Sequence, residues 1–303
     1  MTLNGKGLLS VGVLGFGLLL ASCTSNSSTS PPISSASNGS STTSAMTVPR
    51  TPSAMLEAVV VNTEALKSVH LAMNVSETGS VAGHSMDISL TGSGDIDLIN
   101  KTSSFTMSES SPSVPSPLGN MTIDVVNANN TSYISGSAFK GMPGVTKQWI
   151  SAEDTNLSGS SALEAALTDP TSMLSILAKL GTVTLVGQTS VNGQSATQYH
   201  VVVDVAKAAA AEGTTGFGTA MKCLGETNFP IDVFVDSSGR VIEVKYAWDI
   251  SSLMKVSGFT MIMNATVDFS NFNEPVSIAI PPASEVQSFS SLYPTATSAS
   301  HSC

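Results

Sequence analysis

Few residues of this 303-residue chain stand at the spacings that catalysis requires. The four histidines are scattered, and none belongs to an H-E-x-x-H motif, the spacing that brings two imidazoles to one zinc ion. No G-x-S-x-G motif presents a serine nucleophile. Asp95 with Asp97 and Asp232 with Asp236 are carboxylate pairs, but pairs on or beside strands are typical of a solvated surface. We interpret His200 as a structural histidine. The sequence therefore predicts that the protein is not an enzyme and that it has no metal site and no cofactor.

One cysteine stands where a covalent modification is expected. Cys23 follows Leu20-Ala21-Ser22, behind an apolar run from Leu8 that is shorter than the ~20 residues needed to span a bilayer. A preceding Lys6 and the small residues after the run are typical of a secretory signal. The tetrapeptide resembles the bacterial lipobox, in which the cysteine thiol receives a diacylglyceryl group and the signal is cut before it. We predict a lipoprotein signal peptide over residues 1–22, the alternative being an ordinary secretory signal with a chance cysteine.

The segment behind Cys23 has the composition of a flexible tether. Thr24 to Pro49 contains no charged residue and few apolar ones, so it cannot bury enough apolar surface to offset the entropy of ordering. We predict a disordered tether over residues 23–50. Because two or more acyl chains attach a protein durably, the protein is expected on the extracytoplasmic face of the cell membrane.

Composition limits the partners of the remaining chain. The net charge is -10, charged residues make up only 11% and the mean hydropathy is +0.22. An acidic chain without a Lys/Arg cluster is not expected to bind nucleic acid or to adhere electrostatically to anionic lipid. The apolar excess has to be buried. We predict one domain over residues 51–286, followed by a Ser-rich tail over residues 287–303.

Two further cysteines, Cys223 and Cys303, remain in the exported chain. An oxidising compartment favours a disulfide between them, which would attach the C-terminal tail to the domain. Free thiols are the alternative, because Cys303 is the last residue of the sequence. Neither cysteine has a second Cys or a His at the spacing of a zinc motif.

Alternating side chains predict long strands with one apolar face. From Met86 to Leu98, apolar residues and glycines alternate with polar residues, and the same period recurs over 121–125 and 259–269. Asn192-Gly193 predicts a tight hairpin, and Asp236 to Gly239 predicts a second one. Helices are expected over 54–69, 162–180 and 205–211, the first with one face made of Met55, Ala58, Val59, Asn62, Ala65, Leu66 and Val69. This order predicts an α+β domain.

Several segments of the chain also occur in a characteristic order, namely YISG, DPTSMLSIL, VTLVGQTSVNGQSATQYHVVVDV, FPIDVFVDSSGRVIEVKY and NEPVSIAIPP. With the lipobox and the tether, this order resembles the LppX/LprG family of actinobacterial envelope lipoproteins. The resemblance implies a fold similar to the LolA and LolB lipoprotein carriers. That fold is a strongly curved, unclosed antiparallel half-barrel with helices packed on its concave face. It also implies a hydrophobic cavity that holds the acyl chains of envelope lipids or glycolipids, with no reaction.

The resemblance assigns the lining of this cavity to one face of the sheet and to one helix. The residues expected there are Met86, Ile88, Leu90, Met121, Ile123, Val125, Leu174, Leu177, Val233, Met261, Met263 and Val267. Methionines suit a wall that adapts to irregular apolar shapes, although a plain core would use the same residues. A protein-interaction or assembly module without a lipid cavity is the alternative function. The sequence names neither the lipid nor a membrane transporter that would work beside the protein.

Overall fold

The structure is a computed structural model that describes residues 51–81, 83–112, 120–139, 142–153, 177–212, 221–222, 225–251 and 258–292. Its helices and strands are, in chain order, α2 (Pro52–Glu64), β1 (Ser68–Val81), β2 (His84–Asp97), β3 (Thr102–Ser110), β4 (Asn120–Ala128), β5 (Thr131–Gly136), η2 (Ser137–Phe139), β6 (Trp149–Glu153), β7 (Gly181–Val191), β8 (Gln194–Asp204), α5 (Val205–Glu212), β9 (Asn228–Val235), β10 (Val241–Asp249), β11 (Thr260–Ser270), η3 (Ala283–Glu285), β12 (Val286–Ser288) and α7 (Phe289–Leu292).

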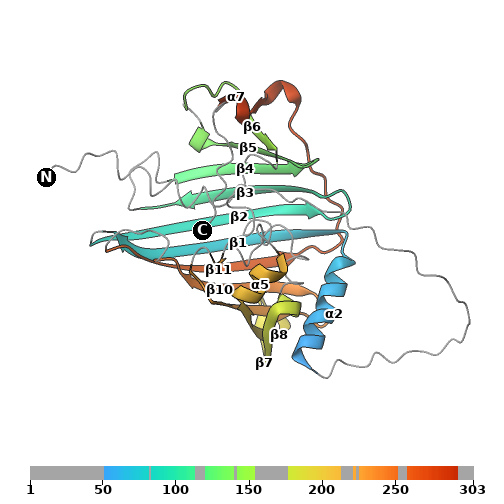
Figure 1. Cartoon of the computed structure of the whole chain (residues 1–303). Helices are drawn as coiled ribbons and strands as arrows, with labels where there is room; N and C mark the ends of the chain where they lie inside the picture. The colour runs from blue at the N-terminus through green and yellow to red at the C-terminus, as the bar shows by residue number, and fades with distance from the viewer. Residues whose placement is uncertain are drawn as a thin grey trace, which may run out of the picture.

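The described strands form one open sheet in the order β12-β6-β5-β4-β3-β2-β1-β11-β10-β9-β8-β7. Neighbouring strands are antiparallel except β12 and β6, which are parallel. Because β12 and β7 are free edges, the sheet does not close into a barrel, and Figure 1 shows it curving with α2 and α5 beside β8 to β10. The predicted α+β half-barrel with helices on its concave face is confirmed, with one parallel pair at its edge. β12 also carries the sheet across the boundary predicted at residue 286.

The first helix is shorter than its periodicity predicts. Thr51 caps it, its Oγ1 accepting from the amide of Ala54 over 3.2 Å. The helix ends at Glu64, and Val69 already belongs to β1, where it pairs with Ile96. Val69 was therefore wrongly included in the helix, because pairing with β2 overrides its local preference. The predicted helix face is also rotated, since the buried residues are Leu56, Val59, Val60 and Thr63.

Both predicted hairpins are confirmed. Asn192 and Gly193 have φ values of 51° and 81° between β7 and β8, which is the positive-φ pair that a tight type I′ turn requires. The β9–β10 hairpin turns through residues 236–240. The helix predicted over 205–211 is confirmed as α5. Most of the helix predicted over 162–180 lies outside the described residues, and residues 177–180 are helical.

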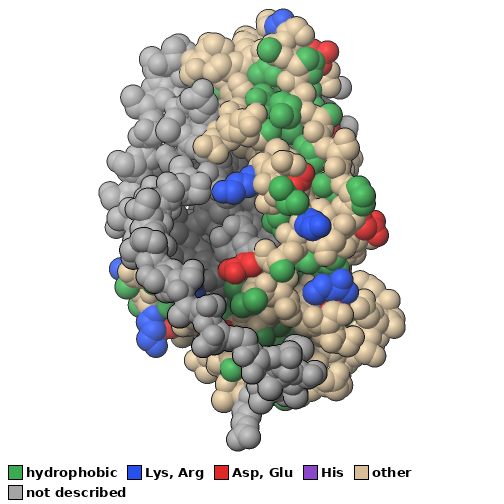
Figure 2. Space-filling model, turned by 90° about the vertical axis from the view of Figure 1, so that its right-hand side faces the viewer, with side chains coloured by type: hydrophobic (Ala, Val, Ile, Leu, Met, Phe, Trp, Pro, Cys, Tyr) green, Lys and Arg blue, Asp and Glu red, His purple; other side chains and the backbone are tan. Residues whose placement is uncertain are grey.

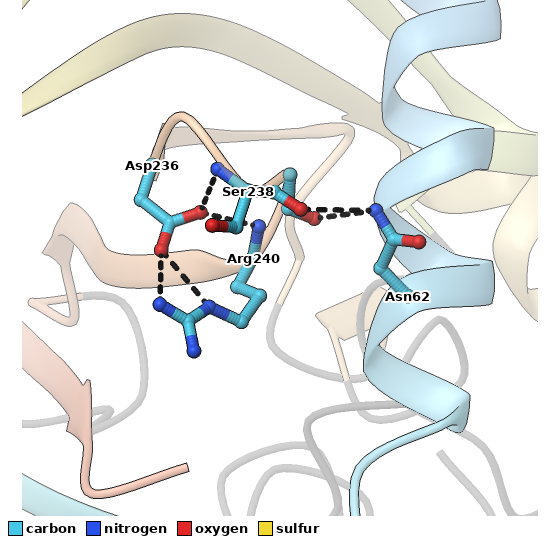
Figure 3. Close-up of polar contacts among 5 residues, drawn as sticks. Asn62, Asp236, Ser238 and Arg240 are labelled. Atoms are coloured by element: carbon cyan, nitrogen blue, oxygen red, sulfur yellow. Dashed lines mark hydrogen bonds and ion pairs between the residues drawn. The ribbon is translucent and has the colours of Figure 1, made fainter. Parts of the chain in front are cut away.

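Asp236 in the second hairpin is buried, which corrects its interpretation as a surface residue. Its side chain is only 1% exposed, and Oδ2 accepts from Arg240 Nη2 over 2.7 Å and from Nε over 2.9 Å. Oδ1 accepts from the amides of Ser238 and Arg240, both over 2.9 Å. Figure 3 shows this network, with Asn62 of α2 reaching the same turn. Asp236 therefore organises the turn that meets α2.

Within the described residues, no helix combines the length and the apolar character that crossing a bilayer requires.

Candidate functional site

One face of the sheet is apolar over most of its width. Residues that pair across neighbouring strands point to the same face, so the register sorts the side chains. We call the face that packs against α2 the inner face, because Leu56 of α2 shares a core with Leu71 of β1. By this criterion, all ten sheet residues predicted to line a cavity lie on the inner face, namely Met86, Ile88, Leu90, Met121, Ile123, Val125, Val233, Met261, Met263 and Val267.

The predicted helical residues have different outcomes. Leu177 is 1% exposed and belongs to the core that α2 shares with the inner face. Leu174 lies outside the described residues. The structure therefore brings eleven of the twelve predicted residues to one side of the sheet, while their role in a lipid cavity stays a prediction.

Two apolar clusters meet on the inner face. The larger cluster runs from β8 through β3 and includes residues of α2 and α5. The second cluster continues across β3, β4 and β5, and consists of Met107, Met121, Ile123, Val125 and Ile134. Met73 and Leu90 pack against both clusters. The apolar surface is therefore continuous across the inner face.

The larger cluster has an aromatic part that hydrogen bonds hold in place. Phe229 lies 5.5 Å from Tyr246 and 6.1 Å from Trp248, measured between ring centroids. Trp248 donates from Nε1 to Glu226 over 2.8 Å, and Tyr199 donates from its hydroxyl to Met55 Sδ of α2 over 3.3 Å. Burial raises the pKa of the Tyr199 hydroxyl and that of Tyr246. These rings therefore remain neutral and fixed on the α2 side of the inner face.

Sequence reasoning missed several inner-face residues on β3. Phe105 and Met107 lie opposite Gly94 and Gly92 of β2. A side-chain carbon at Gly92 would lie 3.1 Å from Met107 Cγ, so the glycine leaves room for the methionine. The signal was the alternation in TSSFTMSES, which is easy to overlook because serines and threonines surround the two apolar residues.

Two carboxylates also belong to the inner face, and neither was predicted. Glu77 of β1 lies between Ile88 and Met263 on the neighbouring strands. Glu109 of β3 lies between Leu90 and Met121 and is 8% exposed. Desolvation raises the pKa of Glu77, and it raises that of Glu109 to about 7, with the charge of Glu77 as the second cause. The apolar face thus contains two groups whose ionised forms are destabilised.

The opposite end of the inner face on β3 to β5 is polar and internally satisfied. Asn127 donates from Nδ2 to Ser103 Oγ over 3.0 Å, and Ser132 Oγ donates to Asn127 Oδ1 over 2.7 Å. Because Ser103 and Glu109 are six residues apart on one strand, the apolar stretch between them spans about 20 Å. This stretch carries Phe105 and Met107.

His70 of β1 and His200 of β8 lie on the outer face of the sheet. His70 Nδ1 lies 2.7 Å from Asp95 Oδ1, and His200 Nδ1 lies 2.8 Å from Asp232 Oδ1. Both pairs join directly opposed residues of neighbouring strands. Asp97 accepts from the amides of residues 99 and 100, and these bonds lower its pKa. These groups support the sheet and its turns, as the interpretation of His200 anticipated.

The remaining predicted sites lie outside the described residues. Cys23, Cys223 and Cys303 all fall there, so the lipid anchor and the disulfide stay predictions. In the described part of the chain, no group of three or more His, Cys, Asp or Glu side chains is placed to hold a metal ion.

The surface beside the sheet is uneven. On the side that Figure 2 shows, hydrophobic side chains of the described residues lie interspersed with basic and acidic ones.

No protein-family model matches the chain, and no curated protein does. Among solved structures, the chain is similar to the lipoprotein LppX of Mycobacterium tuberculosis, with 14% identity over 75% of this chain and 97% of that chain and a TM-score of 0.41. The chain is also similar to LprF of Mycobacterium bovis, with 13% identity over 76% of this chain and 96% of that chain and a TM-score of 0.41. A putative outer membrane lipoprotein-sorting protein domain of Vibrio parahaemolyticus is 9% identical over 73% of this chain and 92% of that chain, with a TM-score of 0.28.

The similar solved structures therefore include LppX, which gives its name to the family that the sequence resembles. At these identities and TM-scores, the likeness adds nothing on function. A proposal on function therefore has to rest on the inner face of the sheet.

Proposed function

We propose that this protein binds the acyl chains of an envelope lipid or glycolipid against the inner face of its sheet and carries the lipid within the cell envelope. The observation that supports this proposal is the continuity of the apolar inner face through Met73 and Leu90, which pack against both apolar clusters. Each buried methylene contributes about 0.8 kcal/mol. An acyl chain along this face would therefore gain enough free energy to leave water.

The composition of the face suits a chain-shaped ligand. Met73, Met107, Met121 and Met263 lie on the inner face of four strands, and methionine adapts to ligands that vary in shape. Lipid transfer requires burial and release but no bond making, so the protein needs no nucleophile or metal for this role. Anchoring through Cys23 would hold the domain near its lipid source, since a tether of this length spans on the order of 30 Å.

A matched pair of tryptophan substitutions on β2 tests the proposal. Leu90 is half-buried on the inner face between the two clusters, and Thr91 is exposed on the outer face. Leu90→Trp would fill space on the inner face, whereas Thr91→Trp would leave it unchanged. Full-length wild type and both variants are purified, their thermal unfolding is recorded, and the lipid extracted from each is quantified by mass spectrometry.

We expect wild type and Thr91→Trp to carry lipid in similar molar amounts and a folded Leu90→Trp to carry several-fold less. If wild type carries no lipid and takes up none from added vesicles, the proposal is wrong. The interaction module without a lipid cavity would then be the better interpretation.

A further inference from the structure

The register places Glu77 and Glu109 on the same stretch of the inner face. Glu77 pairs with Ile88, and Glu109 pairs with Leu90, so the two glutamates flank β2 from opposite sides with an offset of two residues. Two strand spacings and this offset put their Cα atoms on the order of 12 Å apart. The two carboxylates influence one another, because the charge of Glu77 contributes to the raised pKa of Glu109.

Within the described part of the chain, Glu109 is a buried polar group without a partner. It is 8% exposed, and among the described residues neither Glu109 nor Glu77 has a hydrogen-bond donor or an ion-pair partner. A buried carboxylate is expensive unless a donor or a cation satisfies it. The comparison with Glu243 is direct, because this buried glutamate on the outer face accepts from Lys245 Nζ over 2.7 Å.

No lysine or arginine of the described strands lies on the inner face. The inner-face positions of β1 to β11 contain no Lys or Arg, their one histidine is the exposed His84 at the start of β2, and Lys245 of β10 lies on the outer face. Beside Glu77 and Glu109, a phosphate or another anionic group would therefore meet carboxylates and no lysine or arginine of the strands. A positively charged group would satisfy both glutamates, because ionised carboxylates act only as hydrogen-bond acceptors.

Given the lipid-binding function proposed above, we propose that Glu77 and Glu109 form a head-group site for the amino group of an amphiphile. The ammonium group lies between the two carboxylates and donates to both. The hydrocarbon chain runs from there along Met107 and Phe105 toward the polar end at Ser103, a path of about 20 Å. The site therefore selects for an amine at one end of the apolar face and against an anion.

Two single-chain amphiphiles with the same hydrocarbon chain test this inference. Dodecylammonium chloride and dodecyl glucoside, both below the concentrations at which they form micelles, are titrated into the delipidated full chain at pH 8 in a calorimeter. The variants are Glu109→Gln and Glu77→Gln, and Glu243→Gln on the outer face is the matched control. Circular dichroism confirms that each variant is folded.

Because a hydrogen bond to a charged group is typically worth a factor of about ten or more in affinity, we expect wild type and Glu243→Gln to prefer the amine by roughly tenfold. Glu109→Gln and Glu77→Gln should each lose most of this preference and keep their affinity for the glucoside within about twofold.

Each other outcome overturns the inference. Equal binding of the two amphiphiles by wild type, or a preference for the amine that survives both inner-face substitutions, shows that the glutamates do not select an amine. A glucoside affinity that falls in the inner-face variants assigns them to hydroxyl groups instead. In these cases the proposed function still stands, whereas the absence of binding by either amphiphile contradicts both proposals.

Discussion

Asn62 of α2 donates from Nδ2 to the carbonyl oxygen of Gly239 over 3.2 Å, although the two residues are 177 positions apart. The same amide group also reaches the carbonyl oxygen of Ser238 at 3.4 Å. Gly239 has a φ of 74°, and a side-chain carbon there would meet Asn62 Nδ2. The first helix is therefore held on the sheet by a polar contact with the β9–β10 turn as well as by its apolar face (Figure 3).

Replacing Asn62 with Ala should loosen this attachment. Loss of the hydrogen bonds leaves carbonyl groups of the turn without their donor, and the expected decrease in the free energy of unfolding is about 1 kcal/mol. Urea unfolding measures the decrease, and hydrogen exchange should be accelerated selectively in α2. Asn264→Ala, at an exposed position of β11, is the control. Unchanged exchange in α2 would show that its apolar face alone holds the helix.

Replacing Asp236 with Asn should be far more damaging than the same change at Asp232. Asp236 is buried and binds Arg240 through two nitrogen atoms, so its loss costs on the order of 3 kcal/mol. Asp232 and its partner His200 have side chains that are 36% and 42% exposed, and such a pair contributes less than about 1 kcal/mol. Chemical denaturation of both variants checks the order. Equal losses would contradict the organising role of Asp236.

Glu109 should make the stability of the protein dependent on pH. Its pKa is raised in the folded state, to about 7, so the folded chain binds more protons than the unfolded chain between the two pKa values. Stability therefore falls as the pH rises from about 4.5 to about 7. Relative to Glu109→Gln, wild type should lose on the order of 2 kcal/mol across this window. Identical pH profiles of unfolding for the two proteins would rule out a buried carboxyl at this position.

Gly94 should not tolerate a side chain. A carbon added there would collide with the carbonyl of Ser104 and with the ring of Phe105 on β3. Gly94→Ala is therefore expected to destabilise the fold by about 1–3 kcal/mol, whereas Ser93→Ala, at an exposed position next to it, should be nearly neutral. Thermal unfolding compares the two. A neutral Gly94→Ala would mean that β2 and β3 can separate without cost.

Local patterns of the sequence predicted the parts of this fold that depend on neighbouring residues. The alternation after Met86 predicted which residues of β2 share its apolar face, and Asn192-Gly193 predicted the β7–β8 hairpin. Both signals are fixed by backbone geometry. The end of α2 could not be predicted in this way, since pairing of β1 with β2 decides where Val69 belongs. The burial of Asp236 likewise depends on its approach to Arg240 and on the neighbouring α2.

The candidate head-group site could not be found from the sequence for a related reason. Glu77 and Glu109 come together only because β1 and β3 both pair with β2 in a particular register. Each glutamate alone looks like one polar residue within a strand. Cys23, by contrast, is predicted directly from the sequence, because the lipobox is a contiguous motif, and its lipidation stays a prediction.

The most direct test of the proposed lipid-carrying function is the mass of what accompanies the intact protein. Native mass spectrometry of the full chain purified from membranes, before and after incubation with lipid vesicles, measures this mass. The proposed function predicts a discrete mass increase that matches one or a few lipid molecules and that is strongly reduced by Leu90→Trp. A folded protein whose mass corresponds to the polypeptide and any covalent modification alone, before and after incubation, would contradict it.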